Sequence, residues 1–296
     1  MQMNRTLKGY LLTILSAVMF GFVPAVAKLG YACGFSPIGL TFFRNLTATL
    51  MLAVIVPATG EPLGIKDRSS LGKVCLLGLF CTTITPLLLY ISYSFIPSGM
   101  ATTFHFTYPA LTILGTALVM HRPIHRSQVF CVLLCTIGIF LFYSPDGQIR
   151  LIGAATALLS GVTYTAYILL LDKFRLTGIS ALKATFYMTL VASVILFVVC
   201  LLTGNLSAPK SLAGVGVCIL TALLSTVGAT VLFQKGTLLL GGARSAILST
   251  FEPITSVIVG ILVFHDPFSF KTILGSVCVI AAAILIAVFD LRKEKR

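Results

Sequence analysis

The sequence predicts an all-α polytopic membrane protein, with ten transmembrane helices arranged as two inverted five-helix repeats. Hydrophobic residues make up 57% of the 296 positions and charged residues only 10%, a composition that a soluble domain of this length could neither bury nor expose. The apolar runs are about 20 residues long, the length that a helix needs to cross a bilayer core of about 30 Å. They lack the roughly 10-residue alternation of an outer-membrane barrel. Most of the chain is therefore expected to lie in lipid.

Ten apolar segments alternate with short polar joints. We expect helices at about 8–27, 37–57, 71–92, 98–120, 127–143, 151–171, 180–202, 212–235, 242–264 and 270–289. The joints are too short to form an extramembrane domain of the size of a soluble enzyme. Any chemistry is therefore expected inside the helical bundle.

An internal repeat spans the chain. Shifted by 144 positions, the sequence places Pro109 on Pro253 and then keeps this register without gaps. The other matched pairs include Gly9 with Gly153, Ser16 with Ser160, Ser36 with Ser180, Phe42 with Phe186, Gly60 with Gly204, Gly72 with Gly216, His121 with His265 and Pro123 with Pro267. Apolar bias alone does not explain matches of Gly, Pro, Ser and His. We expect a first five-helix repeat over 1–147 and a second over 148–296.

Five helices per repeat is an odd number, so the second repeat should enter the membrane from the opposite face. The charges of the joints agree, because the first joint carries only Lys28 whereas its equivalent carries Lys173 and Arg175. Inverted repeats are typical of secondary transporters, in which the two halves exchange conformations and so move the opening of a central site across the membrane. The repeat therefore favours a transporter over a receptor or a scaffold.

The net charge of +13 follows the loops. If the N-terminus is cytoplasmic, the opposite face carries only Lys28, Arg150, Lys210 and Lys271, while the other loop Lys and Arg residues fall on the cytoplasmic face. Short cytoplasmic loops rich in Lys and Arg are the signature of membrane topology. Both termini are therefore expected in the cytoplasm, at a plasma or inner membrane, and nucleic acid is not an expected partner.

The eight cysteines do not indicate a cofactor. Most lie within the expected spans, where a free cysteine behaves as a small apolar residue. The ligand spacings of zinc sites are absent. We therefore expect no metal, cofactor or structural disulfide.

Polar residues form stripes along several expected spans, and such residues normally face the bundle interior or a water-filled cavity. The matched stripes are Ala101, His105, Tyr108 and Thr112 with Ser245, Ser249, Glu252 and Ser256, and Thr82, Pro86, Tyr90 and Tyr93 with Thr226, Thr230, Gln234 and Thr237; the sixth span adds Ser160, Thr163, Tyr164 and Tyr167. Small hydroxyl residues also pack helices together without touching a ligand. The bulky polar side chains of Tyr90, Tyr108, Tyr164 and Gln234 favour a cavity lining more strongly.

The fifth and tenth spans carry few polar groups, and we expect them to face lipid or to form the contact of a homodimer.

Prolines within spans remove a backbone hydrogen bond, so Pro24, Pro86, Pro109 and Pro253 each free the carbonyl four residues earlier. Those carbonyls need other partners, either neighbouring hydroxyls or groups in a cavity.

Two charges lie inside spans. Arg44 is about 10 Å below the outer end of the second span, close to the level of Glu252 in the ninth. They are expected either to neutralise one another as a structural ion pair or to act as substrate or proton sites. His105 is open to a packing role as well as to proton relay or substrate binding.

Short motifs resemble the EamA branch of the drug/metabolite transporter superfamily over essentially the whole chain. They are Thr41-Phe42-Phe43-Arg44, Thr107-Tyr108-Pro109, Phe251-Glu252-Pro253 and Asp266-Pro267. The resemblance implies an exporter or facilitator of amino acids, related metabolites or drugs, with a central cavity between the halves. The family often has Gly-Glu at the ends of the fourth and ninth spans, where this chain has His121-Arg122 and His265-Asp266.

The expected function is secondary transport of small polar metabolites such as amino acids by alternating access. A multidrug or lipophilic-cation exporter and a non-transporting receptor or scaffold are the alternatives. No HExxH, nucleophile elbow or P-loop is found, so an enzyme or ATP-driven pump is not expected. The expected substrate-binding residues are Arg44, Tyr90, His105, Tyr108, Tyr164, Gln234 and Glu252.

Overall fold

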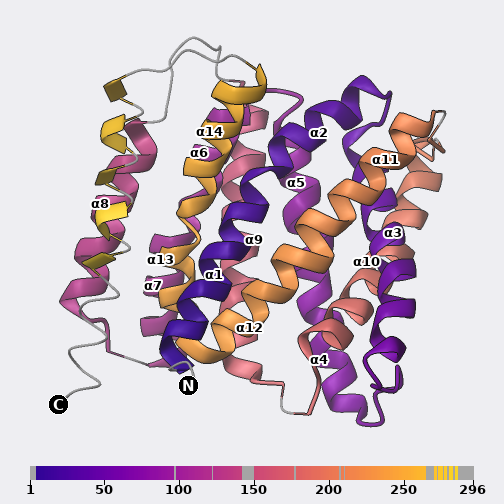
Figure 1. Ribbon diagram of the computed structural model, residues 1–296, viewed down its shortest axis with the longest axis horizontal. Coiled ribbons are helices and arrows are strands. Elements are labelled where there is room, and N and C mark those ends of the chain that lie inside the picture. The colour runs from indigo at the N-terminus through magenta and orange to yellow at the C-terminus, as the bar shows by residue number, and fades with distance from the viewer. Residues whose placement is uncertain are drawn as a thin grey trace.

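The computed structural model of the chain is a bundle of helices packed side by side (Figure 1). It describes residues 5–96, 98–121, 123–141, 150–176, 178–206, 208–209 and 211–264, followed by 270–271, 273–275, 277–278, 280–282 and 284–285. All regular secondary structure in these residues is helical. The all-α class predicted from the composition is therefore confirmed.

The helices of the first half are α1 (Arg5–Gly21), α2 (Val23–Ala32), α3 (Pro37–Ala58), α4 (Arg68–Gly78), the π-helical segment η1 (Leu79–Ile84), α5 (Thr85–Ser92), α6 (Ser98–His105), α7 (Tyr108–Met120) and α8 (Arg126–Leu141). Those of the second half are α9 (Leu151–Phe174), α10 (Ala181–Thr203), α11 (Leu212–Thr221), the π-helical segment η2 (Ala222–Thr230), α12 (Val231–Leu240), α13 (Gly242–Leu248) and α14 (Phe251–Phe264). Several elements adjoin, so that one expected span often comprises two or three of them.

Seven helical runs in the described residues are long and apolar enough to cross a bilayer. They are Arg5–Ala32, Pro37–Ala58, Arg68–Ser92, Leu151–Phe174, Ala181–Thr203, Leu212–Leu240 and Gly242–Val263. Three shorter apolar helices, Tyr108–Met120, Arg126–Gly138 and Ile273–Ala282, coincide with the fourth, fifth and tenth expected segments. The fourth is shortened because the helix breaks at Phe106 and Thr107, just before Pro109. The chain is therefore a multi-pass membrane protein.

The two halves repeat the same helix-capping devices 144 residues apart. Ser36 caps α3 by accepting a hydrogen bond from the Gly39 backbone N–H at 3.0 Å, and Ser180 caps α10 by accepting from Lys183 at 3.2 Å. A serine oxygen at this position satisfies one of the unpaired N–H groups of a helix start. The local sequence thus starts these two helices in the same way.

A second matched pair of caps starts α4 and α11. Asp67 accepts hydrogen bonds from the backbone N–H groups of Ser69 and Ser70, and its counterpart Ser211 accepts one from Gly214. Hydrogen bonds from the side chain and then the backbone of Ser70, and from the backbone of Ser69, hold the pKa of Asp67 below its ordinary value of 3.8. Each of these helices then leads into a π-helical segment, so the wider backbone winding is repeated too.

The contacts between the halves are reciprocal. α3 packs on α10 with the Thr49 and Ser193 hydroxyl oxygens, which are 144 residues apart, at 3.4 Å. α1 packs on α12, and its counterpart α9 packs on α5. Small residues allow close approach, since a Cβ added to Gly78 would lie 2.7 Å from the Met188 Cα. The described chain therefore has a two-repeat architecture.

Several predicted features lie outside the described residues. They are Arg122, Lys210, the His265-Asp266-Pro267 segment, the C-terminal basic residues and the end of the expected tenth helix. The placement of these groups relative to the bilayer stays a prediction.

Candidate functional site

A small cavity of about 60 Å³ lies among α1, α2, α3, η1, α5, α9, η2 and α14, near the end of α6. Its lining residues are Phe20, Val23, Pro24, Arg44, Cys81, Thr82, Thr85, Pro86, Leu89, Tyr90, Tyr93, His105, Tyr164, Ser225, Thr230 and Glu252. The cavity, here called the central cavity, joins residues from both repeats. Five of the seven predicted site residues line it, namely Arg44, Tyr90, His105, Tyr164 and Glu252.

Arg44 is buried two turns into α3, and its guanidinium reaches α5 and η1. Its Nη2 donates to the Thr82 carbonyl at 3.3 Å, and Asn45 Nδ2 donates to the same oxygen at 2.9 Å. This carbonyl is free because Pro86, four residues later, has no N–H to donate to it. The predicted proline-freed acceptor is therefore present, and Asn45 satisfies it at the shorter distance.

The Arg44 guanidinium keeps further binding capacity. Its Cζ lies 5.7 Å from the centroid of the Tyr90 ring, within the range of a cation–π contact. Its Nε makes no hydrogen bond in the described part of the chain. A guanidinium has five N–H donors, so one long bond to a carbonyl leaves most of them for a ligand.

Glu252 lies in the first turn of α14, partly buried, on the wall of the central cavity. Its side chain makes no hydrogen bond or ion pair among the described residues, so the ion pair with Arg44 that was one expectation is not formed. α1 holds this turn closely, because a Cβ added to Gly21 would lie 2.7 Å from the Glu252 carbonyl oxygen. Two opposite charges thus share one cavity without contacting each other.

His105, at the end of α6, has one ring nitrogen in a defined hydrogen bond. Its Nδ1 lies 2.8 Å from Ser160 Oγ, and that hydroxyl donates its only proton to the Ala157 carbonyl at 2.6 Å. The serine oxygen must therefore accept, which makes His105 Nδ1 the protonated nitrogen and leaves Nε2 as the acceptor of a neutral ring. Packing thus explains only one of the two polar atoms of His105.

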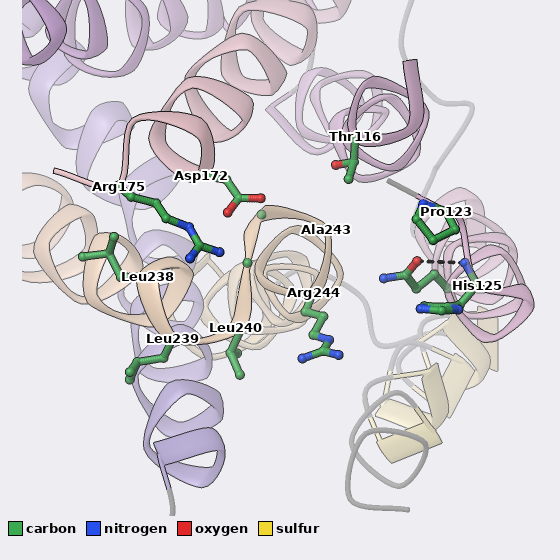
Figure 2. A pocket seen from close by; sticks show the side chains of 13 residues that line it. Thr116, Pro123, His125, Asp172, Arg175, Leu238, Leu239, Leu240, Ala243 and Arg244 are labelled. Atoms are coloured by element: carbon green, nitrogen blue, oxygen red, sulfur yellow. Dashed lines mark hydrogen bonds between the residues drawn. The ribbon is translucent and has the colours of Figure 1, made fainter. Parts of the chain in front are cut away.

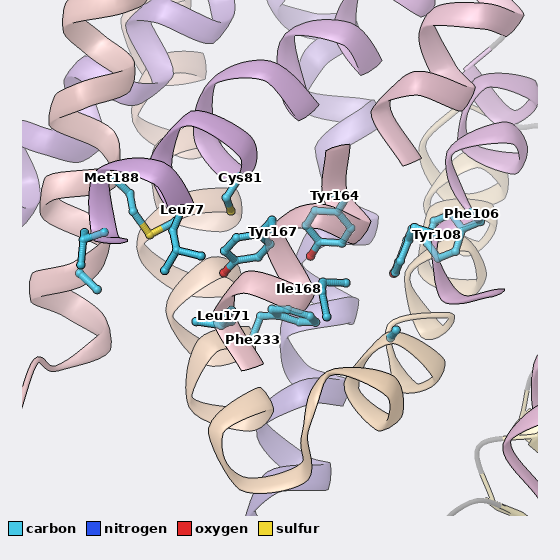
Figure 3. Packing of buried hydrophobic residues seen from close by; sticks show 13 residues of the cluster. Leu77, Cys81, Phe106, Tyr108, Tyr164, Tyr167, Ile168, Leu171, Met188 and Phe233 are labelled. Atoms are coloured by element: carbon cyan, nitrogen blue, oxygen red, sulfur yellow. The ribbon is translucent and has the colours of Figure 1, made fainter. Parts of the chain in front are cut away.

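Aromatic rings form the wall beside His105. Tyr164 lines the cavity at 5.6 Å from the His105 ring, and Tyr108 packs edge-on against Tyr164 at 4.8 Å. Figure 3 shows Tyr108, Tyr164 and Tyr167 in one row with Phe233 beside them. Tyr108 is fully buried and does not line the cavity. It therefore supports the wall rather than forming its surface.

Gln234 also lies away from the cavity surface. Its Nε2 donates to Thr185 Oγ1 of α10 at 2.9 Å, because the side chain points toward α10 from α12. Cys81, Thr85 and Ser225 do line the cavity, although the sequence did not select them. Cys81 and Ser225 lie in η1 and η2, whose repeated π-helical winding has no clear sequence signal.

Membrane-length helices from two related halves, around a cavity whose cation and carboxylate are not paired with each other, are typical of a membrane transporter. The sequence pattern of the EamA-like transporter family matches residues 7–144 and again residues 151–288. The chain belongs to this family, so the resemblance seen in the motifs is confirmed.

Relatives agree with this assignment. The chain is 24% identical over 277 residues to the uncharacterized transporter YcbK of Bacillus subtilis, covering 90% of this chain and 88% of that protein. It is 30% identical over 214 residues to the uncharacterized transporter sll1319 of Synechocystis, covering 69% and 62%. A solved crystal structure with 14% identity superimposes with a TM-score of 0.78 over 98% of this chain and 99% of the other, which shows the fold.

Proposed function

We propose that the protein is a secondary transporter, an exporter or facilitator, of small polar metabolites such as amino acids. The observation that carries the proposal is the coexistence of Arg44 and Glu252 on the central cavity without an ion pair between them. A charge inside a membrane bundle without a counter-charge is costly. A zwitterion offers a carboxylate to the guanidinium and an ammonium group to the carboxylate, so its binding relieves both costs.

The mechanism we propose is alternating access between two inverted halves of five helices each. The reciprocal contacts support it, since Thr49 meets Ser193 and the packing of α1 on α12 is repeated by α9 on α5. Contacts in which equivalent surfaces meet each other are those of a two-fold axis. Such an axis in the membrane plane relates inverted repeats, and the loop charges support cytoplasmic termini.

The size of the central cavity fits a closed stage of this cycle. Its volume of about 60 Å³ holds a few water molecules, whereas ligand pockets typically enclose about 300–1,000 Å³. Binding of a metabolite therefore requires the surrounding helices to separate. The π-helical segments η1 and η2 lie at the cavity wall, where this separation would occur. They contribute Cys81, Thr82, Ser225 and Thr230 to that wall.

A lipophilic-cation exporter is the second candidate. Glu252 and the rings of Tyr90, Tyr93 and Tyr164 around the cavity would suit an organic cation through charge and cation–π contacts. Arg44 on the same cavity repels a cation, which is why the zwitterion is preferred.

A homodimer remains part of the proposal. The exposed apolar side chains of α8 form a surface that fits lipid or a second copy of the chain, and they are Val129, Phe130, Leu133, Ile137 and Phe140.

The test is efflux from proteoliposomes that contain the purified protein. Vesicles are loaded with radiolabelled zwitterionic amino acids, with the matching amino-acid amides, or with a tetraphenylphosphonium cation. The proposal expects release of zwitterions well above protein-free vesicles, with the amides released slowly. Release of the organic cation alone would establish the second candidate instead.

A further inference from the structure

A second pocket, with a volume of about 330 Å³, surrounds the turn between α12 and α13. The ribbon places this turn at the end of the bundle that holds the described N-terminal end of α1 (Figure 1). Figure 2 shows Asp172 and Arg175 on one side of the pocket, His125 on the other and Arg244 between them. This pocket is here called the inner pocket. Gly241 (φ 84°) makes the turn, a backbone conformation that favours glycine.

Two helices lead directly from the central cavity to the inner pocket. On α9, Tyr164 lines the central cavity and Asp172 lines the inner pocket. Thr230, directly before α12, lines the central cavity, and Leu238 of α12 lines the inner pocket. Each pair is eight residues apart, which is about 12 Å along a helix. The two spaces are therefore separated by a layer of about two helical turns.

Buried side chains close this layer. Tyr164 and Tyr167 stack at 5.6 Å, and Phe233 packs on them at 5.9 and 6.2 Å. Ile168 and Leu171 continue the same cluster toward the inner pocket (Figure 3). The layer thus blocks passage between the two spaces in this conformation.

Four hydroxyls in or beside this layer are buried without a hydrogen-bond partner in the described part of the chain. They belong to Tyr108, Tyr167, Thr237 and Ser245. Cys81 and Gln234 lie near the Tyr167 hydroxyl and Ser249 lies near the Tyr108 hydroxyl, but none of the three hydrogen-bonds to its tyrosine. Most buried polar groups in proteins are paired, so four in one layer need an explanation.

Other buried hydroxyls of the bundle behave differently. Thr13 donates to the Gly9 carbonyl at 2.9 Å, and Thr49 donates to the Asn45 carbonyl at 2.8 Å. Thr237 and Ser245 each lie four residues from Gly241, one helical turn from the inner pocket on either side of its turn. Among the described residues, the one further buried hydroxyl without a partner is that of Tyr90, on the wall of the central cavity. The unpaired hydroxyls therefore follow one path from the central cavity through the layer and are not a general property of the helices.

We propose that Tyr108, Tyr167, Thr237 and Ser245 line the inner half of the substrate path, which the Tyr164–Tyr167–Phe233 cluster closes in this conformation. The proposal rests on the proposed transport function. When the cluster separates, the central cavity and the inner pocket join, and the four hydroxyls gain water or polar substrate groups as partners. The closed state leaves these hydroxyls unpaired and the open state pairs them, which offsets the free energy needed to separate the apolar side chains of the cluster.

Thiol labelling of single-cysteine substitutions tests this path. Thr237→Cys and Ser245→Cys are compared with Thr13→Cys, a control at the same level because Thr13 packs against Gly236 of α12. The full-length protein is reconstituted in vesicles with the zwitterionic amino acids of the efflux test, and a membrane-impermeant cationic methanethiosulfonate reagent is added on the N-terminal face. Peptide mass spectrometry reads each site separately from the eight native thiols.

The expected result is labelling of positions 237 and 245 at least 10-fold faster than of position 13, with loss of transport in the labelled protein. No labelling is expected from the opposite face when the cluster is closed. Labelling no faster than at position 13 while the vesicles transport would place the path elsewhere and leave the transport function standing. Full transport after complete labelling would overturn the proposal as well. The labelling rates are measured by mass spectrometry and do not require a transport measurement. Absence of transport in wild-type vesicles would therefore count against the proposed function alone.

Discussion

Replacing Arg44 by lysine should remove the proposed preference of the protein for a carboxylate while leaving the fold intact. The guanidinium offers a planar fork of donors that binds a carboxylate through two parallel hydrogen bonds, whereas an ammonium group is a compact point charge. A hydrogen bond to a charged group contributes about 1.5–3 kcal/mol. Loss of one such bond corresponds to a fall of roughly 10- to 100-fold in the preference for an amino acid over its amide.

The structure also limits the cost to stability. The Arg44 bond to the Thr82 carbonyl is 3.3 Å long, and Asn45 keeps its own bond to that oxygen at 2.9 Å. We therefore expect Arg44→Lys to lower the free energy of unfolding by about 1 kcal/mol or less. Asn45→Ala is the matched control, because it removes the shorter bond without changing a residue on the cavity. It should destabilise the protein more than Arg44→Lys and keep the carboxylate preference.

The assay is competition between an amino acid and its amide for transport by wild type and both variants in proteoliposomes, with thermal unfolding in detergent measured in parallel. An unchanged carboxylate preference in a folded Arg44→Lys protein would refute the reasoning and leave Arg44 a structural donor to Thr82. Loss of the preference in Asn45→Ala as well would show that the Thr82 carbonyl, and not the guanidinium, controls the cavity.

Three further predictions concern other parts of the molecule. Glu252→Gln should reduce transport of zwitterions at least 10-fold with little change in thermal unfolding, whereas a variant that no longer folds would assign Glu252 a structural role. Gly78→Ala should destabilise by about 2 kcal/mol because its Cβ would meet the Met188 backbone at 2.7 Å, whereas Gly72→Ala, with nothing within 4 Å, should not. Asp67→Ala should lower the unfolding temperature at neutral pH; since the folded pKa of Asp67 is lowered, the difference should shrink as pH falls below about 4, and a pH-independent difference would contradict the capping role.

The sequence predicts the helical class from its composition and the two repeats from residues that recur 144 positions apart. Apolar runs of membrane length produce the long helices, and the matched Ser36 and Ser180 produce the same cap at the same point of each half. The breaks are less predictable. The stop between α6 and α7 falls just before Pro109, as a proline suggests, but the π-helical winding of η1 and η2 has no clear sequence signal.

The candidate site could be predicted in part. Depth within a span indicates that Arg44 and Glu252 lie at one level, and both line the central cavity. Depth does not fix the direction in which a side chain points, so the sequence could not decide between an ion pair and two separate charges. Gln234 shows the same limit, because a stripe position allows it to face either the cavity or Thr185 of α10, and tertiary contacts select the latter.

Counterflow measures the central claim most directly. Proteoliposomes are loaded with a high concentration of an unlabelled zwitterionic amino acid, diluted into buffer that contains a trace of the same labelled compound, and sampled over time. A carrier whose central cavity opens alternately to each face should accumulate label transiently above its equilibrium level, and Glu252→Gln should lose this overshoot. Label that only equilibrates, at the same rate in wild type and in Glu252→Gln, would contradict alternating access through the Arg44–Glu252 cavity.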